Sequence, residues 1–398
     1  MLGSEKFLEL RRNKSKAMQK VQKIMNDSGL VAPMNVAVGK LTVGERQRVE
    51  ILKALYRDVK ILVLDEPTAV LTPQEADKLF DNITAMTQNG LSVIFISHKL
   101  REVLAFSNRI AVLRHGRKVG EISSKEANER KIARLMVGEE TKVFSRKKLE
   151  VGRPVLEVNN LTISGSSKRE SISDINLSVN KHEILGIAGI SGNGQTVLAN
   201  VISGLIKPSS GKIKIDSENI LSFDPSNIIQ AGVGRIPEDR HKDGIVGQMS
   251  VAENMIIEDL NSSKIQSRGL LNHESIMRYC SDLSSKYDVR GPGPNASARL
   301  LSGGNIQKLI LARVFEASPK LILANQPTRG LDMGAAADVA NRLLEARQRG
   351  SGVILISEDL DEILSLSDRI MVIYDGKLRI AETHDRETLG LMMAGEAA

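Results

Sequence analysis

Residues 61–68 have the sequence ILVLDEPT, and residues 321–328 have the related sequence LILANQPT, 260 positions further along the chain. The same offset relates LTVGE at residues 41–45 to LSGGN at residues 301–305, and it still holds at Gly116. Chance does not keep one offset over such a distance. The sequence therefore contains two copies of one domain.

The two copies are not equally complete in this sequence. The second copy is expected to begin near Val155, well before a glycine-rich stretch at residues 189–196. With an offset of 260, the counterpart of that stretch would precede residue 1, so about the first 105 residues of the first copy are missing from these 398. We expect a partial first copy at residues 1–137, a charged linker at 138–153 and a second copy at 154–398.

Short apolar runs alternate with segments of helical spacing in the first copy. Residues 61–64 and 93–96 predict buried parallel strands, and residues 45–56 and 75–88 predict helices with polar faces. This alternation is typical of an α/β fold with a parallel sheet, whose ligands bind at the carboxyl ends of the strands.

The composition narrows the class of protein. Hydrophobic residues make up 41% and charged residues 26% of the chain, as in ordinary globular domains. Cys280 is the single cysteine, so a reducing compartment is expected. No apolar run is long enough to cross a bilayer or to follow the basic N-terminus as a signal peptide. The net charge of +7 comes with 3% aromatic residues and no tryptophan, so we expect no nucleic-acid partner.

Asp65 and Glu66 follow a predicted strand in the first copy, and His98 follows the next one. An aspartate at a strand end can hold Mg²⁺, an adjacent glutamate can polarise the attacking water, and a histidine can contact the γ-phosphate. An isolated Asp-Glu pair is more often a solvated helix cap. The apolar strand, the repeat and His98 together favour the catalytic interpretation.

A predicted strand at residues 184–188 leads into the glycine-rich stretch of the second copy. Its spacing is that of G-x-x-x-x-G-K-[ST], in which backbone N–H groups cradle phosphates. The residues of this candidate site are Gly189, Ser191, Gly192, Asn193, Gly194, Gln195 and Thr196. Gln195 stands where that pattern has lysine, so the positive charge that would face the phosphates is lost.

Three further positions of the second copy differ from the first. Asn325, Gln326 and Glu358 stand where the first copy has Asp65, Glu66 and His98. Metal ligation, water activation and the γ-phosphate contact are thus weakened together. The sequence predicts a second site that binds nucleotide weakly and does not hydrolyse it.

Residues 301–305 resemble the signature sequence of ABC ATPases. The residues that carry this resemblance are Leu301, Ser302, Gly303, Gly304, Asn305 and Gln307. Together with the tandem copies and the stretches IPEDR at residues 236–240 and QPTRGLD at residues 326–332, they resemble the fused ATPases of sugar and nucleoside importers. Residues 67–75 look more like the nucleoside branch.

The resemblance implies two tandem P-loop cassettes, the first without its N-terminal half. Such cassettes form head-to-tail pairs with ATP and Mg²⁺ between the phosphate loop of one and the signature of the other. The competent pocket would then use Glu66 and His98 with the signature at 301–305. The other pocket would use the altered first signature, Thr42, Val43, Gly44 and Glu45, in which Val43 replaces a glycine.

The resemblance also implies partners and a location. The expected partners are integral-membrane permeases and an extracytoplasmic solute-binding protein, with this chain peripheral at the cytoplasmic face of the inner membrane. The segment 251–287, which follows Glu238 and is expected to be helical, would dock a permease helix; the alternative is a self-contained helical subdomain.

Three alternatives remain open at this point. In the first, the chain is a soluble tandem ABC ATPase that acts on ribosomes or DNA, although such proteins tend to keep both cassettes complete. In the second, it is a non-catalytic remnant. In the third, a separate fragment supplies the missing first phosphate loop and completes the site.

Overall fold

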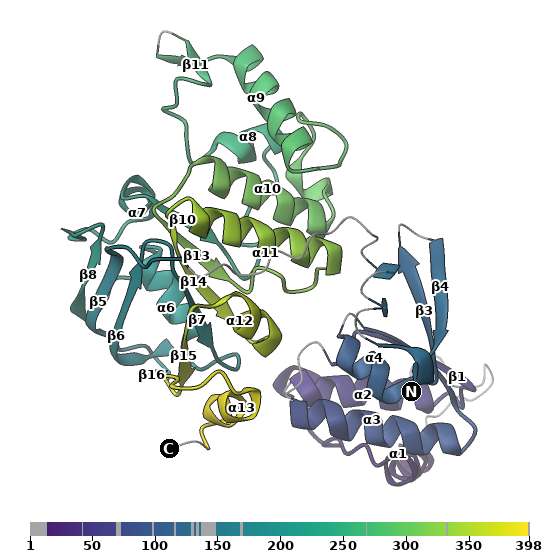
Figure 1. The fold of residues 1–398 in the computed structure, drawn as a ribbon. Coiled ribbons are helices and arrows are strands. Elements are labelled where there is room, and N and C mark those ends of the chain that lie inside the picture. The colour runs from purple at the N-terminus through teal and green to yellow at the C-terminus, as the bar shows by residue number, and fades with distance from the viewer. Residues whose placement is uncertain are drawn as a thin grey trace. The chain divides into compact units, whose positions relative to one another are not determined.

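The computed structural model describes residues 14–41, 43–68, 73–97, 99–114, 117–128, 131–132, 135–136, 149–167, 170–267, 269–331 and 333–396. The chain has two compact units, Met1–Glu140 and Thr141–Ala398 (Figure 1). Most of the expected linker at 138–153 lies outside the described residues. Its boundaries therefore stay a prediction.

The second unit is built on a six-stranded sheet in the order β10-β13-β14-β7-β15-β16. All neighbours are parallel except β15 and β16. The strands are β7 Ile184–Ala188, β10 Val233–Ile236, β13 Leu321–Asn325, β14 Gly352–Ser357, β15 Arg369–Tyr374 and β16 Lys377–Ile380. An antiparallel sheet beside it contains β5 Pro154–Ile163, β6 Ile172–Asn180, β8 Ser210–Ile215 and β9 Glu218–Asn219.

Helices surround these sheets in the second unit. They are α6 Gln195–Ile202, α7 Pro225–Gln230, α8 Val251–Ile256, α9 His273–Lys286, α10 Gly303–Glu316, α11 Met333–Gln348, α12 Leu360–Leu366 and α13 Arg386–Ala394, with a 3₁₀ turn η4 at Ala298–Leu300. Between α8 and α9 lies a short hairpin of β11 Gln266–Ser267 and β12 Leu270–Leu271. The prediction that the segment 251–287 is helical is therefore wrong for this part of it.

Two hydrophobic cores cover the two faces of the six-stranded sheet. Successive side chains of a strand point to opposite faces. Leu321 and Leu323 of β13 accordingly join the core that contains α6 and the antiparallel sheet, whereas Ile322 joins the core that contains α10 and α11. Burial on both faces explains why β13 and β14 are continuously apolar. The predicted α/β fold is confirmed.

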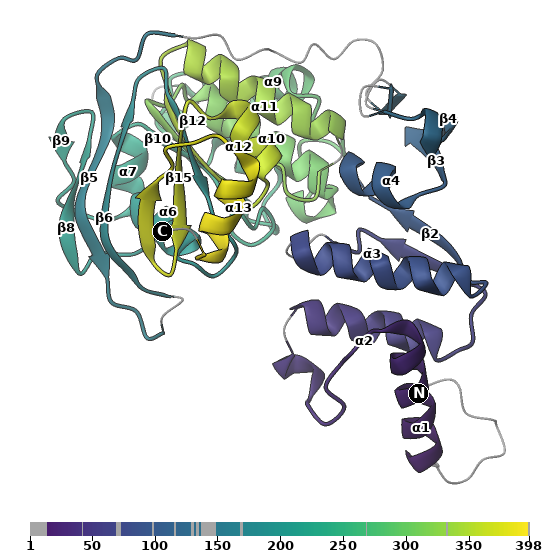
Figure 2. The same ribbon diagram turned by 60° about the horizontal axis from the view of Figure 1, so that its bottom comes forward.

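The first unit contains two separate two-stranded sheets among its described residues. The parallel pair is β1 Ile61–Asp65 with β2 Ser92–Ile96, and the antiparallel pair is β3 Arg109–Arg114 with β4 Arg117–Ser123. The helices are α1 Lys14–Ser28, α2 Val43–Leu55, α3 Pro73–Gln88 and α4 Leu100–Phe106, and the 3₁₀ turns are η1 Val38–Lys40 and η2 Ser124–Glu126. Side chains of α1, α2 and α3 form a core against Leu62 and Leu64 of β1. Figure 2 shows the ribbons of these three helices.

The offset of 260 found in the sequence also holds in the structure. Helices α2, α3 and α4 begin 260 residues before α10, α11 and α12. Ile61 pairs with Ser92 across β1 and β2, as Leu321 pairs with Gly352 across β13 and β14. The two units therefore share one local architecture wherever both are described.

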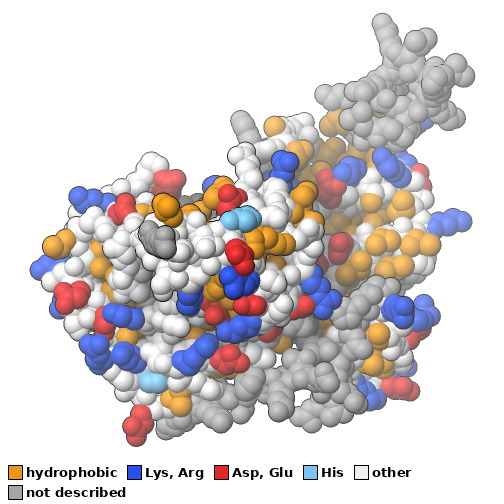
Figure 3. Space-filling view, turned by 90° about the horizontal axis from the view of Figure 1, so that it is seen from above, with side chains coloured by type: hydrophobic (Ala, Val, Ile, Leu, Met, Phe, Trp, Pro, Cys, Tyr) orange, Lys and Arg blue, Asp and Glu red, His pale blue; other side chains and the backbone are white. Residues whose placement is uncertain are grey.

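The prediction that the strands of the first copy are buried is wrong for one of their faces. Ile61, Val63, Ile94 and Ile96 are 60%, 60%, 58% and 51% exposed. Hydrophobic side chains gather on the surface of this unit, toward the right of the view in Figure 3. The reason is that α2 and α3 cover only the opposite face of β1 and β2.

Among the described residues, no helix combines the length and the apolar character that a membrane crossing requires.

Candidate nucleotide sites

The glycine-rich loop of the second unit connects the carboxyl end of β7 to the amino end of α6. Gly192 and Gly194 have φ values of 89° and 108°, a left-handed conformation that glycine adopts without strain. A Cβ at Gly189 would lie 2.6 Å from atoms of Gln195 and of Ile373, so only glycine fits there. The backbone thus keeps the tight path of a phosphate loop.

Gln195 closes this loop on itself. Its side chain is buried, and Nε2 donates a hydrogen bond of 2.8 Å to the carbonyl of Ile190. The backbone N–H of Asn193 donates to Gln195 Oε1 at 3.1 Å. In a loop that holds phosphate, such N–H groups point at the ligand. Here the side-chain amide of Gln195 satisfies the backbone N–H of Asn193 and brings no positive charge to the loop.

An acidic residue just after β10 contacts the start of α6. Glu238 accepts a hydrogen bond of 3.2 Å from the Thr196 hydroxyl and forms an ion pair of 2.7 Å with Arg329. Thr196 occupies the position whose hydroxyl contacts Mg²⁺ in phosphate loops. The ion pair therefore links the loop to the segments that follow β10 and β13.

The structure brings the other altered positions of the second copy together. Asn325 is the last residue of β13 and Gln326 follows it, and Glu358 follows β14, the neighbour of β13 in the sheet. The backbone N–H of Glu358 lies 3.5 Å from Gln326 Oε1. Asn325 is buried, and its Oδ1 has no hydrogen-bond partner among the described residues.

These residues fit Mg²⁺ poorly in the second unit. Mg²⁺ is usually bound through one or two carboxylates and the phosphates of the substrate. Asn325 offers a neutral amide oxygen in place of a carboxylate. The described residues include no group of three or more His, Cys, Asp or Glu suited to a metal. In the first unit, Asp65 presents an exposed carboxylate at the end of β1 and fits the ion better.

Glu66 and Gln326 share an unusual backbone conformation. Their φ values are 44° and 52°, and their N–H groups donate to Ile96 and Ile356 at 2.8 Å in both units. Each backbone therefore places the residue after the strand in the same way. His98 and Thr42 lie outside the described residues.

The signature of the second unit begins α10. Ser302 is the N-cap residue and is exposed, Leu301 is buried, and Gly303 and Gly304 form the first turn. Asn305 donates to Ser302 Oγ at 2.9 Å and accepts from the backbone of Arg290 at 2.8 Å. These bonds hold the start of the helix in place. In the first unit α2 begins at Val43, the equivalent position, with Gly44 and Glu45 in its first turn.

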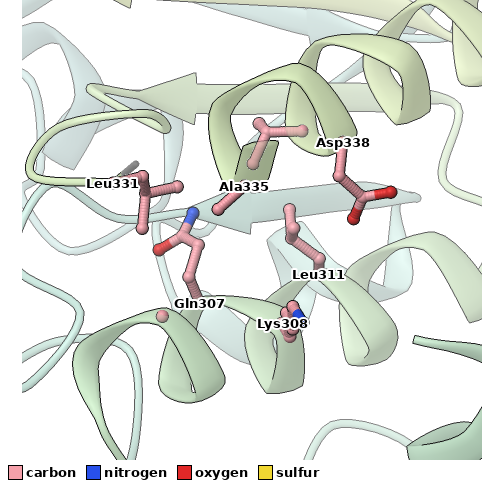
Figure 4. A pocket seen from close by; sticks show the side chains of 8 residues that line it. Gln307, Lys308, Leu311, Leu331, Ala335 and Asp338 are labelled. Carbon is pink, nitrogen blue, oxygen red and sulfur yellow. The ribbon is translucent and has the colours of Figure 1, made fainter. Parts of the chain in front are cut away.

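A glutamine couples the signature helix to the end of the neighbouring strand in each unit. Gln307 Nε2 donates to the carbonyl of Pro327 at 2.9 Å, and Gln47 makes the same contact with Pro67. Figure 4 shows Gln307 of α10 beside Leu331 and Ala335, at a small pocket between α10 and α11. Gln307 thus lies behind the signature and holds the signature helix against the segment that follows β13.

Two glutamates behind the site, the buried Glu102 and the partly buried Glu362, were missed at the sequence level. Glu102 of α4 accepts hydrogen bonds from Thr68 at 2.7 Å and from Ser97 at 3.0 Å, which joins the ends of β1 and β2. Glu362 is its counterpart in the second unit, and the constant offset could have identified the pair. Nothing in the sequence indicated the ion pair of Glu238 with Arg329, because these residues lie 91 positions apart.

Comparison with known proteins defines the class. The profile of the family described as ABC transporter matches residues 3–69 and 172–329, more than half of the chain. The chain belongs to this family, as an ATP-binding component with the ABC ATPase fold.

Its relatives narrow the class further. The chain is 43% identical over 383 residues to the glucose import ATP-binding protein TsgD13 of Haloferax volcanii. This alignment covers 95% of this chain and 70% of that protein. It is 39% identical over 399 residues to the nucleoside import ATP-binding protein NupA of Lactococcus lactis, with coverage of 99% and 79%. It is 35% identical over 380 residues to the ribose import ATP-binding protein RbsA of Clostridium tetani, with coverage of 95% and 74%. The predicted resemblance to sugar and nucleoside import ATPases is confirmed.

Proposed function

We propose that this chain is the ATP-binding subunit of an ABC importer that takes up a nucleoside or a simple sugar. The observation that carries the proposal is the asymmetric repeat. The first copy keeps Asp65 and Glu66 at the end of β1, whereas the second copy keeps the full signature at 301–305 and has lost both carboxylates. The names of the relatives include nucleoside, glucose and ribose importers, so the proposal stays at this solute class.

Catalysis is assigned to the first copy. Asp65 would hold Mg²⁺, which when bound neutralises charge on the β- and γ-phosphates. Glu66 orients and polarises the attacking water, and His98 contacts the γ-phosphate. The left-handed backbone at Glu66 and its N–H bond to Ile96 hold this side chain at the strand end.

The signature of the second copy is assigned to a nucleotide held by another cassette. The exposed N-terminus of α10 offers free backbone N–H groups and the positive end of the helix dipole, both of which favour an anion. The contributing residues are Leu301, Ser302, Gly303, Gly304, Asn305 and Gln307. The altered first signature, Thr42, Val43, Gly44 and Glu45, would contact the second site less closely.

The second site is proposed to bind ATP weakly without hydrolysis. Gln195 already occupies part of its loop, and Asn325, Gln326 and Glu358 replace the groups that hold metal and activate water. Its role would be to complete and stabilise the pair of cassettes.

A membrane permease and a solute-binding protein are the proposed partners, with this chain peripheral at the cytoplasmic face of the membrane. The permease would dock on the segment 251–287. Leu260, Leu270 and Leu271 are 45%, 75% and 53% exposed there, which suits a partner with an apolar surface.

The test uses a completed chain, made by placing residues 154–273 directly before Lys14. This join keeps the offset of 260, because Lys14 corresponds to residue 274. With Gln195→Lys in the inserted copy only, the completed chain should hydrolyse ATP, whereas the 398-residue chain should have negligible activity.

Glu66→Gln should then lower the rate by about a hundredfold or more, because a general base contributes at least that much. Glu50→Gln is the matched control, since Glu50 is exposed on α2 and pairs with Lys53, and it should leave the rate unchanged. Equal rates for Glu66→Gln and Glu50→Gln would refute the assignment.

A soluble tandem ATPase acting on ribosomes or DNA is not favoured. The relatives are import proteins over nearly the full chain, and the low aromatic content offers few stacking surfaces for nucleic acid.

A further inference from the structure

The side chain of Arg240 lies against the start of the signature helix in the second unit. Arg240 belongs to the segment IPEDR, which begins at the last residue of β10. A Cβ added to Gly303 would lie 3.2 Å from Arg240 Nε and 3.3 Å from its Nη2, so the guanidinium packs on the first turn of α10. The glycine at position 303 therefore lets a cation approach the signature backbone closely.

The same guanidinium also contacts the segment that follows β13. Nη1 donates to the carbonyl of Arg329 at 3.2 Å, and Nη2 donates to the carbonyl of Gly330 at 3.4 Å. These bonds are at or beyond the long end of the usual range for N–H···O. They engage two of the five N–H donors of the guanidinium. The remaining three have no acceptor within the part of the chain that the structure describes.

The positive charge of Arg240 is not balanced by an ion pair with any described residue. Its acidic neighbours in the sequence have other partners. Glu238 pairs with Arg329 at 2.7 Å, and Asp239 accepts two backbone N–H bonds of its own turn at 3.0 Å. Burial lowers the pKa of the Arg240 guanidinium, and the charge of Asp239 offsets this only in part. Because burying an unpaired charge is costly, this arrangement favours an anionic ligand.

The helix end beside Arg240 adds to the positive potential. Ser302 forms no side-chain capping bond, and the first turn of α10 contains no acidic residue. A helix N-terminus stabilises nearby anions and disfavours nearby cations. A guanidinium packed against it therefore costs free energy that an anion bound by both groups would offset.

We infer that Arg240 is a further binding residue of the signature site, and that its guanidinium contacts a phosphate group of the nucleotide held by another cassette. The inference deepens the proposed function and rests on it for the identity of the anion. In the alternative, Arg240 only joins Gly303 to the carbonyls of Arg329 and Gly330. The two differ in one respect: a structural link needs hydrogen-bond donors, whereas an anion contact needs the positive charge.

Alkylation of a thiol at the signature measures this preference for anions without any ATP hydrolysis. Ser302→Cys is introduced into the 398-residue chain, in which Cys280 is buried and can stay. The rates of modification by iodoacetate, an anion, and by iodoacetamide, which is neutral, are compared at a pH at which the introduced thiol is ionised. Arg240→Gln should lower the ratio of the two rates about three- to tenfold, as expected for the loss of a unit charge a few ångströms away. Arg240→Lys keeps the charge and should keep most of the ratio.

A second probe and a matched control make the result specific. Inorganic triphosphate, added at constant ionic strength, should slow modification by iodoacetamide, and Arg240→Gln should raise the concentration needed about three- to tenfold. Arg290→Gln is the control, because its backbone N–H bonds Asn305 of the signature while its guanidinium is paired with Asp288 at 2.7 Å. This variant should change the ratio less than twofold.

The outcomes separate the inference from the structural link and from the proposed function. An unchanged ratio in Arg240→Gln, or an equal loss in Arg240→Gln and Arg240→Lys, overturns the inference in favour of the structural link. Equal protection by triphosphate with and without Arg240 overturns it as well. None of these measurements depends on turnover. A completed chain without ATPase activity would therefore refute the catalytic assignment and leave the anion contact of Arg240 supported by the alkylation ratio.

Discussion

Gln195 offers the most direct test of why the second site should bind nucleotide weakly. Gln195→Lys places a cation at the start of α6 and removes the acceptor that now holds the N–H of Asn193. A hydrogen bond to a charged group contributes about 1.5–3 kcal/mol. Because each 1.4 kcal/mol changes affinity tenfold, we expect ATP to bind about ten- to a hundredfold more tightly.

The assay is titration of a fluorescent ATP analogue against the full chain, with ADP and AMP as competitors. ADP and ATP should gain affinity and AMP should not, because the loop lysine contacts the β- and γ-phosphates. Gln195→Met separates the two causes, since it frees the Asn193 N–H without adding charge, and it should gain only a few-fold. Unchanged affinity of a folded Gln195→Lys variant would refute the reasoning, and an equal gain for Gln195→Met would show that charge is not the cause.

Two further predictions concern the groups behind the site. Burial raises the pKa of Glu362 to about 7, an effect that the hydroxyls of Ser357 and Thr328 partly offset. The folded pKa exceeds the unfolded value of 4.5, so this group stabilises the fold at low pH, and the contribution of roughly 3 kcal/mol is lost as the pH rises toward and through 7. Urea unfolding near pH 5 and near pH 8 should show this loss, and Glu362→Gln should abolish it; a pH dependence that survives the substitution would contradict the assignment. Gln307→Leu should lower the free energy of unfolding by about 1–3 kcal/mol, because the buried carbonyl of Pro327 loses its donor. Gln266→Leu, which removes an exposed bond to Leu260, should cost about 0.5 kcal/mol or less in the same assay.

The sequence predicted the local elements well because their signals are local. The apolar runs at 61–64 and 93–96 became β1 and β2, and the segments of helical spacing became α2 and α3. Burial was not predictable in the same way. Residues 61–64 are as apolar as residues 321–324, yet only the second set is covered on both faces. What covers a strand depends on elements far away in the chain, and a local pattern carries no information about them.

The candidate sites show the same division. Residue types and spacing predicted the glycine-rich turn between β7 and α6 and marked the altered positions Gln195, Asn325 and Gln326. The conformation of Gln195, whose side chain folds back onto the loop, was not predictable. A side-chain amide at this position can form hydrogen bonds either with the ligand or with the loop backbone. The ion pair of Glu238 with Arg329 required the tertiary structure, since it joins residues that follow two different strands.

The two copies differ in the groups assigned to nucleotide and agree in the contacts behind them. The glutamine bond from the signature helix to the proline carbonyl is present in both, as are the left-handed residue at the strand end and a glutamate at the equivalent position of the following helix. These contacts fix the relative positions of the signature helix and two strand ends. They do so in both copies, whether the residue after the strand is Glu66 or Gln326. A cassette can therefore lose water activation and still present a well-positioned signature. Under the proposed function, this separation of positioning from chemistry would let the second unit present its signature without a working catalytic site of its own.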